Sequence, residues 1–244
     1  VGAAAAVRAT ADGYTLLFSW AGTLATNVHL YSKMAYDPRR DLLPIVLIGN
    51  VPNILVVNTG LPARTLAEFT DYARGNPGTL NFGSTGNGST SHLITEMLKE
   101  QAGLDLQHVP YRGVPESNNA LITGEIEMAL PPVFQAATLA KAGKIRALAV
   151  TSPQRSPVMP GVPSMQEAGV ADFDQTVWNA LFAPAGTPPD AIAKLNAAIR
   201  DVVAGKDLRQ KMINLGFEPD ATKSPAEAAQ FIRSERAKFA KLVK

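Results

Sequence analysis

The sequence contains no cysteine, which excludes disulfide bonds, thiolate metal ligands and a cysteine nucleophile. It also lacks any run of about 18 apolar residues, the length that a membrane-spanning helix needs. Its basic residues are scattered and the formal net charge is +2, so the contiguous basic stripe of a nucleic-acid-binding protein is missing. We therefore expect no nucleic-acid partner, while the absence of cysteine leaves the cellular compartment open.

Motifs of catalysis and cofactor binding are missing as well. The three histidines, His29, His92 and His108, lie far apart in the sequence and lack metal-ligand spacing. Acidic residues are sparse around residues 83–91, so a carboxylate pair for acid–base catalysis is not indicated. His92 could reach a ligand from the first turn of a predicted helix, although a lone histidine is more often structural or exposed. We expect no catalytic residue, no metal ion and no cofactor.

Apolar segments, by contrast, are plentiful. The chain has 244 residues, 46% of them hydrophobic, which is enough for one large domain or two modest ones. Predicted strands alternate with predicted helices, which favours an α/β fold with parallel-rich sheets. We expect strands at 14–18, 53–57, 107–111, 145–151 and 177–183.

Two of these strands, 53–57 and 177–183, bracket a central block of the chain. We interpret them as the places where the chain crosses between two lobes. The predicted lobe I holds residues 1–54 and 186–244, and the predicted lobe II holds residues 55–185.

The sharpest local feature is a loop rich in glycine, serine and threonine at residues 83–91, directly before a predicted helix. Such a loop frees backbone N–H groups and offers hydroxyls at a helix N-terminus, where the helix dipole favours an anion. It is not a P-loop, because no Lys-Ser or Lys-Thr follows the last glycine, and it lacks the third glycine of a dinucleotide fingerprint. The loop alone fits an anion site and an ordinary capped turn equally well.

A second small and polar stretch, residues 19–23, follows the predicted strand 14–18. In open α/β sheets, ligands bind at the carboxyl ends of strands, so this stretch is a candidate ligand contact. It contains Trp20, one of two tryptophans; the other is Trp178. Core packing is the favoured interpretation for both side chains, and ligand stacking is the alternative.

Seven segments, taken in chain order, carry a family resemblance. They are ADGYTLLF (11–18), FGSTGNGSTSHL (82–93), VPYRG (109–113), GEIEMAL (124–130), AGKIRALAVTS (142–152), VPSMQEAG (162–169) and VWNALFAPAGTPPDAIAKLN (177–196). Together they resemble the Bug family, the extracytoplasmic substrate-binding proteins of tripartite tricarboxylate transporters. The ordered set covers essentially the whole chain and is highly specific, although no single segment would be.

The resemblance implies a two-lobed fold like that of periplasmic binding proteins, with a ligand cleft between lobes joined by two crossover strands. It implies a monomeric periplasmic protein that captures a small organic carboxylate, such as a dicarboxylate, a tricarboxylate or an aromatic acid, and catalyses nothing. The expected partner is the membrane permease of a tripartite tricarboxylate-type transporter, or in some cases a sensor. Ligand contacts to both lobes would favour the closed state.

We assign the expected ligand contacts by matching the family's motifs to positions in this chain. A carboxylate is expected at the loop residues of lobe II, with His92 beside them. Small and polar residues of lobe I are expected to form one wall of the cleft. Tyr111 and Pro131 are expected to flank the cleft. The expected contacts are Ser84, Thr85, Gly86, Ser89 and Thr90 in the loop, and Ser19, Trp20, Ala21, Gly22 and Thr23 in the wall.

Two departures from the family pattern matter. Family chains begin with a strand and a Pro/Gly-rich loop that grips the ligand, and nothing precedes Val1 here, so we expect the N-terminal strand and helix of lobe I to be missing. An Asp often follows the segment at 124–130 in the family, whereas this chain has Pro131 and Pro132. That difference suits a ligand without an ammonium group.

Two other functions remain open at this point. A signalling effector on the same fold would sense the ligand and dock onto a partner. An enzyme on the same scaffold would need a titratable group at the cleft, for which His92 is the best candidate.

Overall fold

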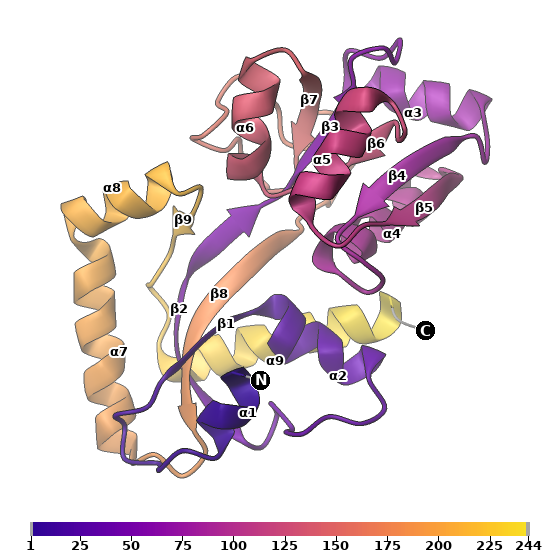
Figure 1. The fold of residues 1–244 in the computed structure, drawn as a ribbon. Helices are drawn as coiled ribbons and strands as arrows, with labels where there is room; N and C mark the ends of the chain where they lie inside the picture. The colour runs from indigo at the N-terminus through magenta and orange to yellow at the C-terminus, as the bar shows by residue number, and fades with distance from the viewer. Residues whose placement is uncertain (1, 243–244) are drawn as a thin grey trace. The chain divides into compact units, whose positions relative to one another are not determined.

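The computed structural model of the chain describes residues 2–242, which fall into two compact units (Figure 1). Unit 1 consists of Val1–Asn50 and Val177–Lys244, and unit 2 consists of Val51–Thr176. Val1 and residues 243–244, the two ends of the predicted lobe I, lie outside the described residues. No helix within residues 2–242 is both long and apolar enough to cross a membrane.

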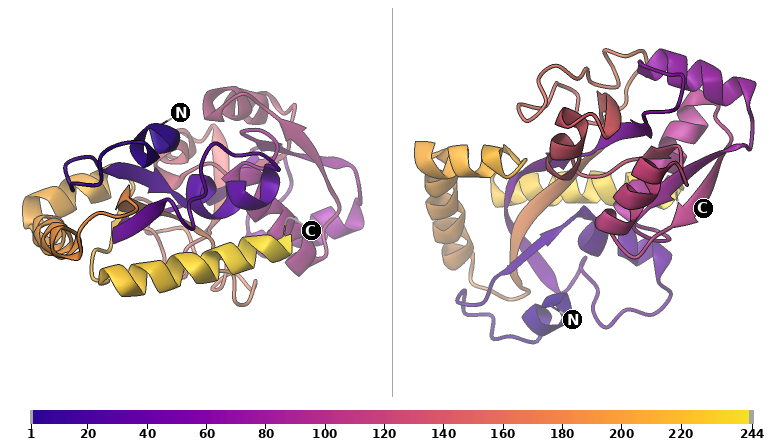
Figure 2. Two further views of the ribbon diagram at one scale, coloured as in Figure 1. Left: turned by 90° about the horizontal axis from the view of Figure 1, so that it is seen from below. Right: turned by 45° about the horizontal axis from the view of Figure 1, so that its top comes forward.

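Unit 1 is built from both ends of the chain, shown indigo and orange to yellow in Figure 2. Its first stretch contains α1 (Gly2–Val7), β1 (Leu17–Trp20), the π-helix η1 (Gly22–Thr26), α2 (Asn27–Leu30) and β2 (Leu42–Pro52). Its second stretch contains β8 (Thr176–Pro184), α7 (Pro189–Ala204), α8 (Lys206–Asn214), β9 (Glu218–Pro219) and α9 (Pro225–Leu242).

The sheet of unit 1 has the strand order β1–β8–β2–β9. β1 runs antiparallel to β8, with Ser19 opposite Ala180, and β2 runs antiparallel to β9. Ile45 of β2 is fully buried and belongs to one apolar cluster with Ile192 of α7 and Met212 of α8. The apolar stripes of these helices therefore cover the sheet, as amphipathic helices do.

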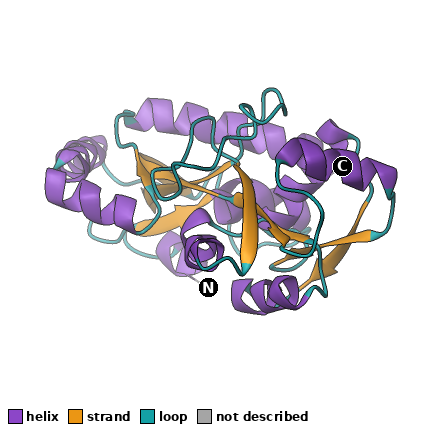
Figure 3. Cartoon of the chain, turned by 90° about the horizontal axis from the view of Figure 1, so that it is seen from above, coloured by secondary structure: helices purple, strands orange, loops and turns teal. Residues whose placement is uncertain are grey.

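Unit 2 alternates strands and helices, which Figure 3 distinguishes by colour. Its elements are β3 (Ile54–Asn58), α3 (Leu66–Gly75), β4 (Leu80–Ser84), α4 (Thr90–Ala102), β5 (Leu106–Pro110), α5 (Val114–Thr123), β6 (Met128–Ala129), α6 (Val133–Lys141) and β7 (Ile145–Val150). The sheet has the order β5–β4–β6–β3–β7. β4 runs parallel to β5 and β6, whereas β3 runs antiparallel to β6 and β7. Phe69, Phe82 and Leu98 lie in its core, each fully buried.

Local sequence chemistry explains where the helices begin. α9 starts with a reciprocal capping box, because the Ser224 Oγ accepts the Glu227 N–H at 3.3 Å and the Glu227 carboxylate accepts the Ser224 N–H at 2.8 Å. Thr65 caps α3 by accepting the Glu68 N–H at 3.2 Å.

The two-sheet α/β architecture confirms the predicted fold class. Each sheet also contains antiparallel pairs: β3 runs against both of its neighbours in unit 2, and β1 and β9 run against theirs in unit 1. Apolar runs such as 53–57 and 145–151 report that a strand is covered on both faces, but they carry no information about its direction. The predicted strand at 14–18 also begins later, at Leu17, because the Asp12 side chain accepts the Tyr14 N–H at 2.9 Å and holds this stretch in a turn.

The crossings between the units lie at 50/51 and 176/177, whereas the predicted boundaries were 54/55 and 185/186. The second difference has a clear cause. β8 pairs with β1 along Asn179–Phe182, and this pairing keeps almost the whole strand in unit 1.

Candidate functional site

Three parallel strands of unit 2 end at one edge of its sheet. The β4–β5 register places Ser84 opposite Pro110, and the β4–β6 register places Gly83 opposite Ala129. The carboxyl ends of parallel strands are where α/β sheets bind ligands. Tyr111 follows β5 and donates its backbone N–H to the Ser84 carbonyl at 2.9 Å. This edge thus brings the predicted loop together with Tyr111.

Pro131 comes two residues after Ala129, the last residue of β6, which lies opposite Gly83 of β4. Its side chain is buried, and its carbonyl accepts the Ile54 N–H at 3.0 Å. Pro132 forms a bridge with Asn53. The structure therefore gives Pro131 a place in the packing next to β3.

The loop between β4 and α4 is folded by its own side chains. The Ser84 hydroxyl is buried and accepts the Gly86 N–H at 3.1 Å. The Ser91 hydroxyl, also buried, accepts the Thr85 N–H at 3.2 Å. Gly86 and Gly88 have φ angles of +111° and +73°, which L side chains rarely adopt. The glycines in this loop therefore allow the tight path by which the chain enters α4.

The start of α4 keeps its polar groups available. Ser89 is the N-cap and its hydroxyl accepts the His92 N–H at 3.3 Å. Among residues 2–242, no hydrogen bond engages the Thr90 hydroxyl or the backbone N–H groups of Thr90 and Ser91. First-turn N–H groups have no intrahelical acceptor, and together with the helix dipole they favour an anion. Thr85 is exposed, and Ser89 and Thr90 are partly exposed.

Two histidines that lie far apart in the sequence meet beneath this loop. The rings of His92 and His108 stack with centroids 3.9 Å apart and an angle of 11° between their planes. Phe82 continues the stack, 4.9 Å from the His108 centroid. Within the described chain, no group of three or more histidine, cysteine or acidic side chains is placed to hold a metal ion.

Sequence reasoning considered both histidines but missed their contact. The parallel register places His108 directly opposite Phe82, and His92 reaches the same place from the first turn of α4. The sequence at 107–111 does not indicate which strand it pairs with or in which register, so no signal in the sequence predicts the pair.

Burial lowers the pKa of His92 below its usual value of 6.5, and burial followed by the nearby His92 lowers the pKa of His108. Both rings are therefore neutral near neutral pH. Burial, together with a hydrogen bond to Glu125, raises the pKa of Tyr111 to about 12. Its hydroxyl donates to the Glu125 carboxylate at 3.0 Å.

The predicted wall residues of unit 1 surround the end of β1. Ser19, Trp20 and Thr23 line a pocket of about 440 Å³ together with Asn27, Tyr31 and Tyr36, among others. Ala21 and Gly22 do not line it: Ala21 is buried, and a Cβ at Gly22 would stand 3.0 Å from the Trp20 Nε1. A π-helix directly follows, which is a feature that often accompanies functional sites.

The two tryptophans have different environments. Trp178 is 1% exposed, which confirms the core prediction, and its Nε1 donates to Glu235 at 3.1 Å. Trp20 is 48% exposed at the end of an edge strand, so the core prediction is wrong for this residue. The alternative interpretation, contact with a ligand, therefore remains for Trp20.

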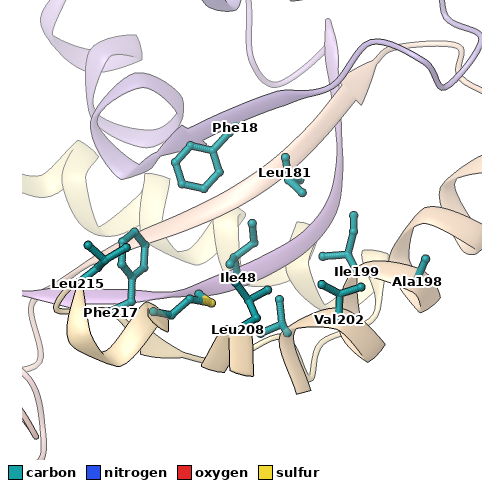
Figure 4. A pocket seen from close by; sticks show the side chains of 11 residues that line it. Phe18, Ile48, Leu181, Ala198, Ile199, Val202, Leu208, Leu215 and Phe217 are labelled. Carbon is teal, nitrogen blue, oxygen red and sulfur yellow. The ribbon is translucent and has the colours of Figure 1, made fainter. Parts of the chain in front are cut away.

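A second pocket of unit 1 is a poor candidate for an anion. It measures about 440 Å³ between the sheet and α7 and α8, and all eleven lining residues are apolar (Figure 4). Phe18, Leu181 and Ile199 point into it from three different elements (Figure 4). A carboxylate buried there would lose its hydration without gaining a hydrogen-bond donor.

Comparison with known proteins supports the family indicated by the sequence. A family model described as the tripartite tricarboxylate transporter family receptor, TctC, matches residues 1–244. Protein BugT of Bordetella pertussis is 31% identical over 249 residues, which cover 100% of this chain and 75% of BugT.

Two solved structures are similar over nearly the whole chain. R. palustris Rpa4515 with adipate is 34% identical with a TM-score of 0.86, over 99% of this chain and 81% of that chain. MatC (Rpa3494) from Rhodopseudomonas palustris with bound malate is 31% identical with a TM-score of 0.81, over 100% of this chain and 83% of that chain. The protein described here therefore belongs to the tripartite tricarboxylate transporter receptor family, TctC, which includes the Bug proteins.

Proposed function

We propose that this protein is a periplasmic solute-binding protein that captures a small organic carboxylate without transforming it. The observation that carries the proposal is the start of α4, where the N–H groups of Thr90 and Ser91 and the Thr90 hydroxyl have no partner among the described residues. Charge-assisted hydrogen bonds to such donors contribute about 1.5–3 kcal/mol each. The adipate and malate in the similar solved structures are carboxylates of this kind.

In this proposal the loop residues divide into two roles. Thr85, Ser89 and Thr90 face the carboxylate, because they are at least partly exposed. Ser84 and Gly86 shape the loop, since the Ser84 hydroxyl already accepts the Gly86 N–H. The pocket of unit 1 around Ser19, Trp20 and Thr23 contributes further ligand contacts.

The ligand is proposed to lack an ammonium group. Pro131 and Pro132 follow β6, where a carboxylate side chain would be needed to balance a positive charge. A proline has no side-chain acceptor. A dicarboxylate, a tricarboxylate or an aromatic acid therefore fits better than an amino acid.

The expected partner is the membrane permease of a tripartite tricarboxylate-type transporter, to which a monomeric binding protein delivers its ligand. The family membership supports this role. Closure of the two lobes on the ligand stays a prediction.

The proposal is tested by titration calorimetry with adipate, malate, a tricarboxylate and an aromatic acid. Adipamide, the neutral diamide of adipate, is the matched control ligand, because it keeps the shape and removes the charge. We expect saturable binding of at least one acid, no binding of adipamide, and recovery of the acid chemically unchanged. A protein that binds no member of the panel, or that binds adipamide equally well, would refute the proposal.

Replacing Thr90 by valine is expected to weaken binding of that acid by about tenfold or more. The change removes one hydroxyl donor and keeps the shape of the side chain and the Ser89 cap, and a hydrogen bond to a charged group contributes about 1.5–3 kcal/mol. The matched control is Thr138→Val on α6, an exposed position in unit 2. Equal affinities of the two variants in calorimetry would remove Thr90 from the site.

A further inference from the structure

The stacked histidines hold the two ends of the loop. The His92 Nδ1 accepts the backbone N–H of Gly88 at 3.0 Å, just before α4 begins. The His108 Nε2 lies 2.6 Å from the Ser84 hydroxyl, where the loop leaves β4. Because the two rings pack face to face, the position of one end of the loop is tied to the position of the other.

The bond to Gly88 fixes the protonation state of His92. A backbone N–H can only donate, so the Nδ1 that receives it must carry a bare lone pair. The ring is therefore neutral, with its proton on Nε2, 3.8 Å from the Glu96 carboxylate. A second proton on the ring would turn Nδ1 into a donor facing a donor, and the bond to Gly88 would be lost.

The groups around the two rings are few. Glu96 and Lys99 approach from α4, and Lys99 pairs with Glu96 at 2.9 Å and lies 5.4 Å from the Phe82 ring centroid. His108 approaches from β5. Burial is the largest cause that lowers the pKa of His92; Glu96 raises that pKa and Lys99 lowers it by smaller amounts.

The sign of the pH effect follows from this shift. The folded protein holds His92 with a pKa below the value of 6.5 that it has when unfolded. The stability that the folded state gains from the neutral His92 ring is fully present above about pH 6.5. It is lost as the pH falls through the lower pKa that His92 has in the folded protein.

We propose that His92 and His108 are positioning residues for the carboxylate-binding loop, and that His92 serves this role only while it is uncharged. Acidification then breaks the hydrogen bond from the Gly88 N–H to the His92 Nδ1. The loop becomes more mobile, and the affinity for the ligand falls. This inference rests on the proposed function for its effect on the ligand, but its effect on the loop itself can be measured without one.

The first test needs no ligand. In ¹⁵N NMR spectra recorded across a pH titration, the amide resonance of Gly88 is expected to shift with the same midpoint as the His92 ring. In His92→Asn, whose side-chain oxygen takes the place of Nδ1 and cannot be charged in this range, the Gly88 shift is expected to disappear. A Gly88 amide that ignores the state of His92 would overturn the inference whether or not any acid binds.

The second test uses adipate, or another acid of the panel, at about pH 8 and at a pH below the His92 midpoint found in the NMR titration, so that the ring is neutral in one case and charged in the other. The titration of the ligand itself is shared by all variants, so only differences between them count. Between the two pH values we expect the affinity of the wild type to fall at least about threefold more than that of His92→Asn, which is the loss that one neutral-group hydrogen bond allows.

His92→Leu, which lacks any acceptor, is expected to bind weakly at both pH values. His29→Asn on α2 is the control for removal of a histidine, because His29 is exposed and lies in unit 1. Parallel loss of affinity in the wild type and in His92→Asn would overturn this inference while leaving the proposed function intact. Absence of any binding by the wild type would instead overturn the proposed function.

Discussion

Replacing Phe82 by alanine is expected to destabilise the protein by about 3–5 kcal/mol, the range found for deleting a buried phenyl ring. Phe82 is fully buried in the core of unit 2, and it stacks on His108 and lies beneath Lys99. Removing the Phe82 ring therefore leaves a cavity next to the histidine pair, and it also exposes apolar surface of the core. Equilibrium unfolding in urea, followed by circular dichroism, measures the change.

The control is Phe134→Ala on α6. Phe134 is 39% exposed, so much of its ring is already in water and the expected loss of stability is clearly smaller. If both variants lost the same stability, the central place of Phe82 in the core would be contradicted.

Replacing Gly83 by alanine is expected to destabilise the protein by about 1–3 kcal/mol, the usual effect of overpacking a core. The added Cβ would overlap the Ile126 Cδ1 and stand 2.6 Å from the Ser117 Oγ. Since Gly83 directly precedes Ser84, the shift that relieves these contacts also displaces the start of the loop. We therefore expect the same variant to bind the carboxylate ligand more weakly than the wild type does.

Gly161→Ala is the matched control for this substitution. A Cβ at Gly161 meets nothing within 4 Å, and its φ angle is not one that side chains avoid. Thermal unfolding and calorimetry should leave this control unchanged. A Gly83→Ala variant as stable and as active in binding as Gly161→Ala would show that the end of β4 tolerates the added methyl group.

Much of the local structure could be predicted from the sequence because it depends on neighbouring residues. A Ser or Thr followed three residues later by Glu marks a helix start, and Thr65 and Ser224 cap α3 and α9 at such positions. The loop at 83–91 leads into a helix N-terminus, because its glycines permit left-handed angles and Ser89 supplies a cap.

The parts that the sequence could not predict depend on strand register and direction. The contact of His92 with His108 requires β4 and β5 to pair in parallel with Phe82 opposite His108, and no residue in either strand encodes that choice. For the same reason, the antiparallel direction of β3 was missed. Trp20 was assigned to the core because of its size, whereas its place on an edge strand leaves it half exposed.

The central claim is that hydroxyl and amide donors at the start of α4 receive a carboxylate. The most direct measurement is a titration of ¹⁵N-labelled protein with the acid that calorimetry identifies, in which each backbone amide is followed separately. The account predicts that the Thr90 and Ser91 amides, which have no partner among residues 2–242, shift most strongly within unit 2 and saturate with the calorimetric affinity. Saturable binding that leaves the amides of residues 85–91 unmoved would contradict it.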